Sequence, residues 1–356
     1  MKEPTMMDLA KVIGFRPSDE QIAAIKSPLE PSMIVAGAGT GKTTVMAARI
    51  AWLIMTQQVA PDRILGLTFT TKAANELLNR VRSYLPKALT FLPPEAAQLD
   101  VGEPIISTYN AFGSRLLKEH ALRLGLEPDA RVVVDATRYQ LAMRVVCTTS
   151  QDLGVLGYTP TIAVTELLKL DEHCSNYLVH PSAIIESDML RLASLNGVEK
   201  KQKLTEEMIE TSAKRIALAE LVLDFRKAKL ANDVIDYSDQ IRLAAQAAQN
   251  SETMRSLLKE QFQVVLLDEY QDTSLSQKVL LQQLFGEGHP VMAVGDPCQA
   301  IYGWRGAEIT NMGNFKTDFP RVISGRQEPA AIYNLTVNRR SGKNILAAAN
   351  VLSDQL

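Results

Sequence analysis

The sequence has few cysteines, no apolar run of membrane length and no large excess of charge of either sign. Cys147, Cys174 and Cys298 lie far apart and form no CxxC pair, which argues against a disulfide framework or a zinc site. No segment approaches the roughly 18 apolar residues of a transmembrane helix, and residues 1–15 lack the apolar core of a signal peptide. We therefore expect a cytoplasmic protein that does not act in a membrane.

The formal net charge of −2 gives no global attraction to nucleic acid, so any contact with DNA must come from local placement of side chains. A chain of 356 residues has a length typical of about two domains. Its hydrophobic content of 46% is enough for sizeable cores. The composition is that of an ordinary globular protein, and only motifs can indicate its function.

Short apolar runs alternate with helical patterns between residues 33 and 110, in the order MIVA, KTTVMAARIAWLI, ILGLTFT, KAANELLNRV and IIST. In the fourth of these, Ala74, Leu77, Leu78 and Val81 recur at the spacing of one helix face. This alternation predicts strands joined by crossover helices, that is, an α/β fold with a parallel sheet. Strand patterns return later in FQVVLLDEY, HPVMAVGD and AAIYNLTV.

Residues 111–234 differ from this pattern. They contain long helical stretches, such as TEEMIETSAKRIALAELVLDFRKAKL, with few strand signals and no basic stripe. The block therefore reads as a helical insertion into the α/β domain.

The segment MIVAGAGTGKTT joins an apolar strand pattern to a glycine-rich turn and a helix that begins at Lys42. Gly37, Gly39 and Gly41 allow the backbone to wrap around phosphate oxygens, and the helix N-terminus adds positive partial charge. Lys42 is expected to reach the β- and γ-phosphates, and the Thr43 hydroxyl to bind Mg²⁺. The alternative is an ordinary glycine turn. The candidate nucleotide-binding residues of this loop are Ala36, in place of the first glycine of the strict pattern, Gly37, Ala38, Gly39, Thr40, Gly41, Lys42, Thr43 and Thr44.

A second motif, VVLLDEYQD, ends an apolar strand pattern with Asp268 and Glu269 side by side. Parallel sheets present ligands at their carboxyl ends, so Asp268 is expected to hold Mg²⁺ and Glu269 to accept a proton from an attacking water. The alternative is a pair of surface acids, although surface acids rarely follow four consecutive apolar residues. Together the two motifs predict hydrolysis of ATP or GTP.

Seven motifs occur in the order found in superfamily 1A DNA helicases, the UvrD, Rep and PcrA group: AGAGTGKTT, LTFTTKAANELLNRV, STYNAFGSRLL, DYSDQI, LLDEYQDTS, AVGDPCQAIYGWRGA and LTVNRRS. The chain resembles this family from about Phe15 to Ser341, over the first half of such a helicase. The form GDPCQA is more similar to the helicase subunits of bacterial helicase–nuclease complexes than to the GDDDQS form of the UvrD type.

The resemblance implies a RecA-like parallel sheet with a helical insertion subdomain. We expect the RecA-like ATP-binding domain, the first motor domain, in residues 1–110 and 235–330. The helical insertion is then residues 111–234. Residues 331–356 are expected to begin a truncated second RecA-like domain.

Several residues match positions that contact ATP in the family. Gln21 matches a glutamine that binds the adenine edge and favours ATP over GTP. Gln299 matches the γ-phosphate sensor, placed with Asp296 at the nucleotide edge of the sheet. Arg340 matches an arginine that reaches the γ-phosphate from across the cleft, so Lys42, Glu269, Gln299 and Arg340 are the expected catalytic residues. The family usually has tyrosine before this arginine, stacked on adenine, and Arg339 replaces it here.

Other residues match positions that meet single-stranded DNA. Aromatic side chains stack on bases of any identity, which suits a motor that ignores sequence. The alternative for each aromatic residue is a place in the core, and STYNAF departs from the family's threonine, phenylalanine, histidine order. The acids and Tyr237 of DYSDQI are expected to be architectural. The expected DNA-contacting residues are Phe69, Thr70, Tyr109, Tyr302, Trp304 and Arg305.

The leading hypothesis is the N-terminal part of an ATP-dependent 3′-to-5′ DNA helicase or translocase. It would use ATP and Mg²⁺ and bind single-stranded DNA, or a duplex with a 3′ tail, with nuclease or DNA repair proteins as partners. One alternative is a nucleotide-gated module that binds DNA or a protein without turnover. Another is an unrelated P-loop ATPase whose insertion binds a protein. Because such helicases step with two RecA-like domains, we expect the 356-residue chain not to unwind DNA efficiently.

Overall fold

The computed structural model describes residues 3–93, 102–124, 127, 129–197 and 202–353. In this part of the chain, no helix combines the length and the apolar character needed to cross a membrane. The chain forms two compact units. Unit 1 is Met1–Phe112, Ser251–Thr273 and Leu281–Leu356, and unit 2 is Gly113–Asn250 and Ser274–Leu280.

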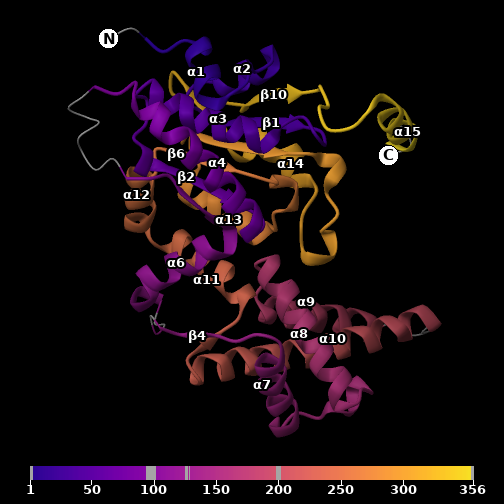
Figure 1. Cartoon of the computed structure of the whole chain (residues 1–356). Helices are drawn as coiled ribbons and strands as arrows, with labels where there is room; N and C mark the ends of the chain where they lie inside the picture. Colours follow the sequence, from indigo (N-terminus) through magenta and orange to yellow (C-terminus); the bar gives the residue numbers. More distant parts are fainter. Residues whose placement is uncertain (1–2, 94–101, 125–126, 128, 198–201, 354–356) are drawn as a thin grey trace. The chain divides into compact units, whose positions relative to one another are not determined.

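Unit 1 contains a six-stranded sheet in which every neighbouring pair is parallel, in the order β10-β1-β7-β6-β2-β3 (Figure 1). The predicted parallel α/β sheet is confirmed, and each strand lies where an apolar run predicted it. The strands are β1 Ser32–Ala36, β2 Ile64–Thr68, β3 Ile105–Thr108, β6 Val264–Leu267, β7 Val291–Gly295 and β10 Ala331–Leu335.

The central strands are apolar along their whole length because helices cover both faces of a parallel sheet. Every residue of β2, β6 and β7 is buried. One core combines these strands with α1, α2, α3 and α4, whose apolar side chains form a continuous buried cluster. The helices of unit 1 are α1 Met6–Ile13, α2 Asp19–Ile25, α3 Lys42–Met55, α4 Thr71–Leu89, α12 Glu252–Gln261, α14 Thr310–Asp318 and α15 Lys343–Ser353.

Smaller elements complete unit 1. An antiparallel hairpin pairs β8 Arg321–Ile323 with β9 Arg326–Glu328, and its turn uses positive φ angles at Ser324 and Gly325. Two helices, α6 Tyr109–His120 and α13 Leu275–Phe285, have residues in both units. The 3₁₀ helices of unit 1 are η1 Pro61–Arg63, η4 Tyr270–Asp272, η5 Pro297–Gln299 and η6 Gly303–Arg305.

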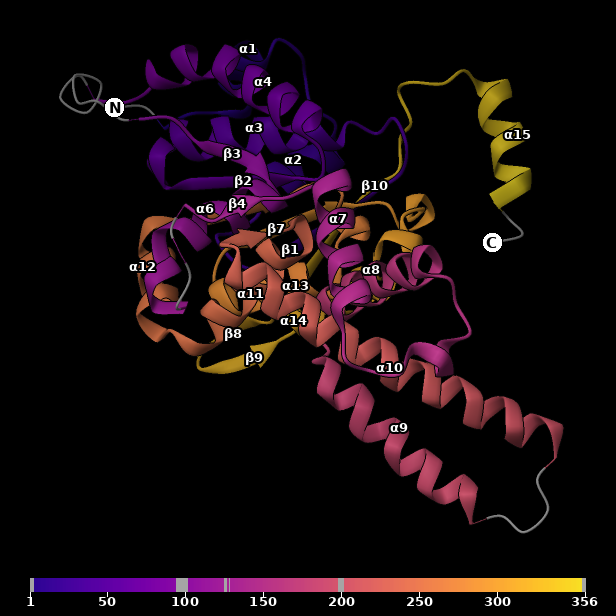
Figure 2. The same cartoon turned by 90° about the horizontal axis from the view of Figure 1, so that it is seen from below.

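Unit 2 is helical, and its long helices α9 and α10 run side by side (Figure 2). Its core joins α7, α8 and α10 through leucine, valine and alanine side chains around the buried ring of Phe225. The unit extends to Asn250, beyond the expected end of the insertion at residue 234. Its elements are η2 Ala121–Leu124, β4 Arg131–Val132, α7 Asp135–Thr148, η3 Leu153–Leu156, α8 Pro160–Asn176, α9 Pro181–Asn196, α10 Lys203–Ala231, β5 Val234–Ile235 and α11 Tyr237–Asn250.

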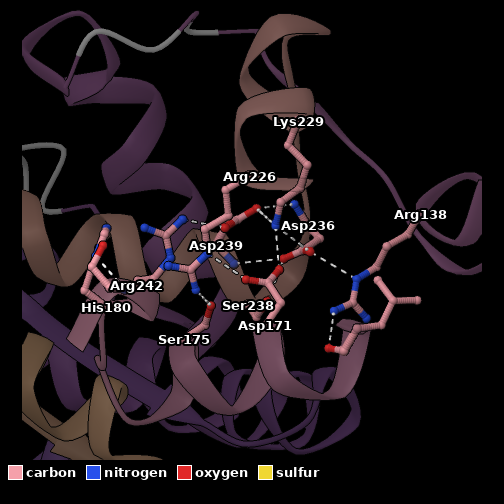
Figure 3. Close-up of polar contacts among 12 residues, drawn as sticks. Arg138, Asp171, Ser175, His180, Arg226, Lys229, Asp236, Ser238, Asp239 and Arg242 are labelled. Carbon is pink, nitrogen blue, oxygen red and sulfur yellow. Dashed lines mark hydrogen bonds and ion pairs between the residues drawn. The ribbon is translucent and has the colours of Figure 1, made fainter. Parts of the chain in front are cut away.

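A buried charge cluster joins three segments of unit 2 around Lys229 (Figure 3). The Lys229 ammonium lies 2.9 Å from Asp171, 3.0 Å from Asp236 and 2.7 Å from Asp239, and all four side chains are almost fully buried. Burial disfavours the charged ammonium, but the three carboxylates outweigh it and hold the pKa of Lys229 above its usual value. The outer partners of these carboxylates are Arg138, Arg226 and Arg242.

This cluster confirms the architectural role expected for the two acids of DYSDQI, Asp236 and Asp239. Tyr237, which we also expected to be architectural, is 58% exposed instead. It is the first residue of α11, and its side chain is not part of the core.

The strand β10 changes the expected domain boundary at residue 331. It pairs with β1 in a register that places Leu335 opposite Ala36, so it completes the first sheet and does not begin a second one. Its residues alternate in burial up to Leu335, as expected of an edge strand that packs one face. The boundary of the first sheet is therefore corrected to lie after β10.

Candidate functional site

The glycine-rich turn lies between β1 and α3, at the carboxyl end of the sheet. Gly41 precedes α3 with φ of 94°, and no side chain caps this helix terminus. The amides of the first turn of α3 are therefore available to a ligand. The turn itself is braced from within, because the Thr40 hydroxyl donates a 2.9 Å hydrogen bond to the carbonyl of Gly37.

Lys42 and Glu269 meet at this edge of the sheet. The Lys42 Nζ atom lies 3.6 Å from Oε2 of Glu269, and the two side chains are 11% and 33% exposed. Asp268 lies next to this pair, at the end of β6, and is buried. Burial and the adjacent Glu269 carboxylate raise the pKa of Asp268 to about 7. Two motifs separated by more than half the chain thus form one polar site.

Glu269 adopts a left-handed backbone conformation, with φ of 48°, which is uncommon for a residue with a side chain. The Gln271 amide donates to Oε2 of Glu269 at 2.8 Å and to Oδ2 of Asp272 at 3.3 Å. Burial, followed by the Glu269 charge, raises the pKa of Asp272 to about 6. These contacts fix the direction of the Glu269 side chain.

The segment after β7 approaches the same edge. Asp296 is buried, and its carboxylate accepts hydrogen bonds from the Gln299 amide at 2.5 Å and from the backbone N–H of Cys298 at 3.0 Å. Gln299 therefore lies beside Asp296, as expected, and is also hydrogen-bonded to it. Gln299 is half-buried in η5.

The residues after β10 lie against the glycine-rich turn. Asn338 donates from its side-chain amide to the carbonyl of Ala38 at 2.6 Å, and the backbone N–H of Arg339 donates to the carbonyl of Gly39 at 2.9 Å. A Cβ atom on Gly39 would lie 2.6 Å from Cβ of Arg340, so this position excludes a side chain. The backbone of Arg340 is thus held beside the turn, and its side chain is exposed.

Gln21 links α2 to the glycine-rich turn. It is buried, its Nε2 donates to the carbonyl of Thr40 at 3.1 Å, and its Oε1 accepts from the backbone of Ser18 at 3.1 Å. An amide nitrogen carries two N–H groups, and the bond to Thr40 uses one of them. An open cavity of about 640 Å³ is lined by residues of α1, α2 and their connection, among them Phe15 and Arg16.

Three aromatic side chains form a row on unit 1. The ring of Tyr302 stacks on Phe69, with centroids 5.2 Å apart at 26°, and lies 6.3 Å from the ring of Trp304. Trp304 is 72% exposed, and Phe69 and Tyr302 are half-buried. Thr70 is exposed and caps α4. Arg305 lies in η6, but its side chain is outside the described part of the structure.

Tyr109 has a different place from the one expected. Its side chain is 3% exposed, and its hydroxyl donates to the backbone carbonyl of Asp268 at 3.0 Å. Tyr109 is therefore a buried residue that supports the backbone of Asp268, and its ring is not exposed as the expected DNA contact requires. The apolar register at the start of α6 turns this ring inward.

The residues present fit a nucleotide with Mg²⁺. The uncapped N-terminus of α3 and Lys42 offer positive charge to phosphate oxygens. Thr43 and Asp268 offer a hydroxyl and a carboxylate, which are ligands that Mg²⁺ prefers. A divalent cation beside Asp268 would favour the ionised carboxylate and so oppose the rise in pKa that burial causes.

Several site residues were not identified from the sequence. Gln271 and Asn338 lie inside motifs that were recognised, but their bonds depend on tertiary contacts. Arg80 donates to the Thr44 hydroxyl at 2.6 Å from the fourth helix, α4. Arg80 is 36 residues from Thr44 in the sequence, so no local signal identified it.

The family model and the similar proteins found for this chain all indicate the same helicase family. Residues 18–320 match the model of the UvrD/REP helicase N-terminal domain. The chain is 28% identical over 337 residues to the ATP-dependent DNA helicase PcrA of Bacillus subtilis, covering 95% of this chain and 39% of that protein. It is 27% identical over 336 residues to DNA helicase II of Escherichia coli, covering 94% of this chain and 40% of that protein.

The chain thus spans about two fifths of the length of these relatives. The family match covers both the glycine-rich turn with Lys42 and the strand end with Asp268 and Glu269. It also includes the aromatic row. The chain therefore belongs to the UvrD/REP helicase family, and residues 18–320 correspond to the N-terminal domain of that family.

Proposed function

We propose that unit 1 binds ATP with Mg²⁺ and hydrolyses it in a reaction coupled to single-stranded DNA. In this proposal unit 1 is the ATP-binding motor domain and unit 2 its helical insertion. The observation that carries the proposal is the convergence of Lys42, Glu269 and buried Asp268 at one strand edge. The printed names of the relatives, ATP-dependent DNA helicase and DNA helicase II, support the same reading.

Each residue has a distinct role in the proposal. Lys42 and the amides of the first turn of α3 bind phosphate oxygens. Thr43 and Asp268 hold Mg²⁺, which when bound neutralises charge on the phosphates. Glu269, aimed by its hydrogen bond from Gln271, orients a water and accepts its proton.

Other residues complete the nucleotide site. Gln299, held by its hydrogen bond to Asp296, contacts the γ-phosphate. Arg340 contributes positive charge from the segment after β10, which lies against the glycine-rich turn. The cavity with Phe15 and Arg16 lies beside α2, where an aromatic ring and a guanidinium plane suit a purine base. Gln21 then binds the base edge with its remaining N–H.

The DNA surface in this proposal is the row of Phe69, Tyr302 and Trp304. Base stacking on exposed aromatic rings contributes about 1–3 kcal/mol per base and does not depend on sequence. The family resemblance adds 3′-to-5′ direction, a duplex with a 3′ tail as substrate, a cytoplasmic location and nuclease or repair proteins as partners.

The test is ATP hydrolysis by the chain with and without single-stranded DNA. We expect DNA to raise the rate, and Glu269→Gln to lower it by about 100-fold or more while nucleotide still binds, because general-base catalysis contributes at least that factor. Nucleotide binding with no hydrolysis under either condition, in the wild type as well as in the variant, would instead support a nucleotide-gated binding module.

A further inference from the structure

Gln271 occupies an unusual position between the acidic strand end and the segment after β7. It is 1% exposed in η4. Its Nε2 atom donates to Glu269, as described above, while its Oε1 accepts from the backbone N–H of Asp296 at 3.0 Å. Both ends of one amide are therefore engaged, one with a carboxylate of the hydrolytic site and the other with the backbone of the sensor segment.

The surroundings of Gln271 leave little freedom for this amide. A Cβ atom on Gly295 would lie 2.7 Å from Oε1 of Gln271 and 2.8 Å from Sδ of Met312. The glycine thus leaves room for the Gln271 amide to reach the backbone N–H of Asp296, the residue that follows β7. A side chain at position 295 would displace the amide and break its bond to Asp296.

The path continues from Asp296 toward the aromatic row. The carboxylate of Asp296 accepts from the Gln299 amide at 2.5 Å. Gln299 ends η5, and Tyr302 follows it by three residues with its ring on Phe69. A continuous sequence of short contacts thus runs from Glu269, through Gln271 and Asp296, to the segment that carries the aromatic row.

We propose that Gln271 is a positioning residue that couples the hydrolytic carboxylate Glu269 to the Asp296–Gln299 segment, and through it to the DNA-binding aromatic row. The inference rests on the proposed function, since it requires both ligands. When Glu269 moves, the Gln271 amide that donates to it moves as well. The Oε1 atom of the same amide accepts from the backbone N–H of Asp296, so the position of Asp296 changes in turn. Gln271 itself is buried, so it acts through Glu269 and Asp296 and not on a ligand directly.

The test compares wild type with Gln271→Met, which keeps the length of the side chain and removes both polar contacts. The dissociation constant of a fluorescein-labelled oligonucleotide is measured by anisotropy, with and without a non-hydrolysable ATP analogue and Mg²⁺. We expect the analogue to change DNA affinity of the wild type by about fivefold or more. In Gln271→Met this ratio falls to about one, while DNA affinity without nucleotide stays within about twofold.

The matched control is Gln282→Met, because Gln282 donates to the carbonyl of Asp318 at 3.2 Å, away from these motifs. It should keep the wild-type ratio. If Gln271→Met fails to fold in thermal unfolding, Gln271→Asn serves instead, since its shorter side chain cannot span both partners. A second readout is hydrolysis, where loss of positioning lowers kcat and leaves KM unchanged.

The outcomes separate the inference from the function on which it rests. A wild-type ratio retained by the Gln271 variants overturns the coupling role and leaves the proposed function intact. A wild type whose DNA affinity ignores the analogue also overturns it. A wild type that binds neither ligand overturns the proposed function itself, and the inference with it.

Discussion

The side chain of Asn338 reaches the carbonyl of Ala38 at 2.6 Å, and its Oδ1 atom accepts from the backbone N–H groups of Arg340 and Ser341 at 2.9 Å each. One side chain thus holds the segment after β10 against the glycine-rich turn. We expect Asn338→Ala to weaken ATP binding by about threefold to tenfold, because hydrogen bonds of this kind contribute about 1 kcal/mol each. Titration with a fluorescent ATP analogue measures the change.

The control for this prediction is Asn334→Ala, since Asn334 is exposed on β10. Its affinity should equal that of the wild type. Equal affinity in Asn338→Ala would show that the segment does not help to shape the nucleotide site.

Lys42→Ala should remove most ATP affinity without unfolding the chain. The turn around Lys42 is braced by backbone and Thr40 contacts that do not involve the lysine side chain. Isothermal titration with ATP and Mg²⁺ gives the affinity, and thermal unfolding confirms the fold. Lys72→Ala is the control, because that side chain is 87% exposed on α4. A folded Lys42→Ala variant with unchanged affinity would contradict the phosphate site.

The raised pKa of Asp268, about 7, predicts that Mg²⁺-dependent ATP binding strengthens between pH 6 and pH 8. Below pH 7 the carboxyl is mostly protonated and is a poor cation ligand, and above pH 7 it is mostly ionised. The affinity should rise by up to about tenfold over this range, which follows the ionised fraction. Asp268→Asn should flatten the profile. The same slope in that variant would assign the titration to another group.

The same shift has the opposite consequence for the ligand-free fold. The unfolded chain loses the Asp268 proton near pH 4 and the folded chain only near pH 7, so stability falls as the pH rises between these values. Asp268→Asn should therefore raise the melting temperature at pH 8 more than at pH 4. Thermal unfolding without nucleotide measures this difference, and an equal effect at both pH values would argue against a buried, protonated carboxyl.

Single-stranded DNA should quench the fluorescence of Trp304. The other tryptophan, Trp52, is 7% exposed in the core of unit 1, so DNA cannot stack on it. Trp52→Phe should keep the quench and Trp304→Phe should lose it. Added salt should weaken the binding through counterion release. A signal that follows Trp52 would place the DNA surface elsewhere.

Lys229→Met should destabilise unit 2 by about 3–5 kcal/mol, because it leaves three buried carboxylates without their shared cation. Urea unfolding followed by circular dichroism measures the loss. Lys227→Met is the control and should have little effect, since Lys227 is 77% exposed. An equally small effect of Lys229→Met would mean that the carboxylates are protonated or hydrated when the lysine is absent.

The cluster also predicts a pH dependence. Burial opposes ionisation of Asp236, but Lys229 and Arg138 outweigh it and hold the pKa of Asp236 well below its usual range. A depressed carboxyl pKa stabilises the fold above the unfolded value near 4, and this stability is lost as the pH falls below it. Wild type should therefore lose more stability than Lys229→Met between pH 5 and pH 3.

Local sequence predicted the parallel sheet, and it predicted that the glycine-rich turn and the Asp268–Glu269 pair lie at its carboxyl edge. Strand β6 was evident because it is fully apolar, and β1 because four of its five residues, all except Ser32, are apolar. The groups that follow these strands are fixed by chain connectivity. The aromatic row was predicted only as separate residues. Phe69 and Tyr302 meet because their strands end at the same edge of the sheet, and that contact depends on strand order.

Other features depend on contacts that the sequence does not display. Tyr109 follows β3 as a polar aromatic residue, and nothing local distinguishes a ring turned toward the core from one turned toward DNA. Lys229 lies in a helical segment rich in charge, where the usual expectation is a solvated face. Its burial follows from three aspartates on two other segments. Asp236 and Asp239 follow it closely in the chain, whereas Asp171 is distant from it in sequence.

The register between β10 and β1 fixes where the segment after β10 meets the glycine-rich turn. With Leu335 opposite Ala36, the three residues that follow reach the turn with Asn338 at Ala38. A slip of two residues keeps the same face inward but shifts the strand by about 6.6 Å, more than twice the length of a hydrogen bond. One added residue between Leu335 and Asn338 should therefore act like loss of the asparagine.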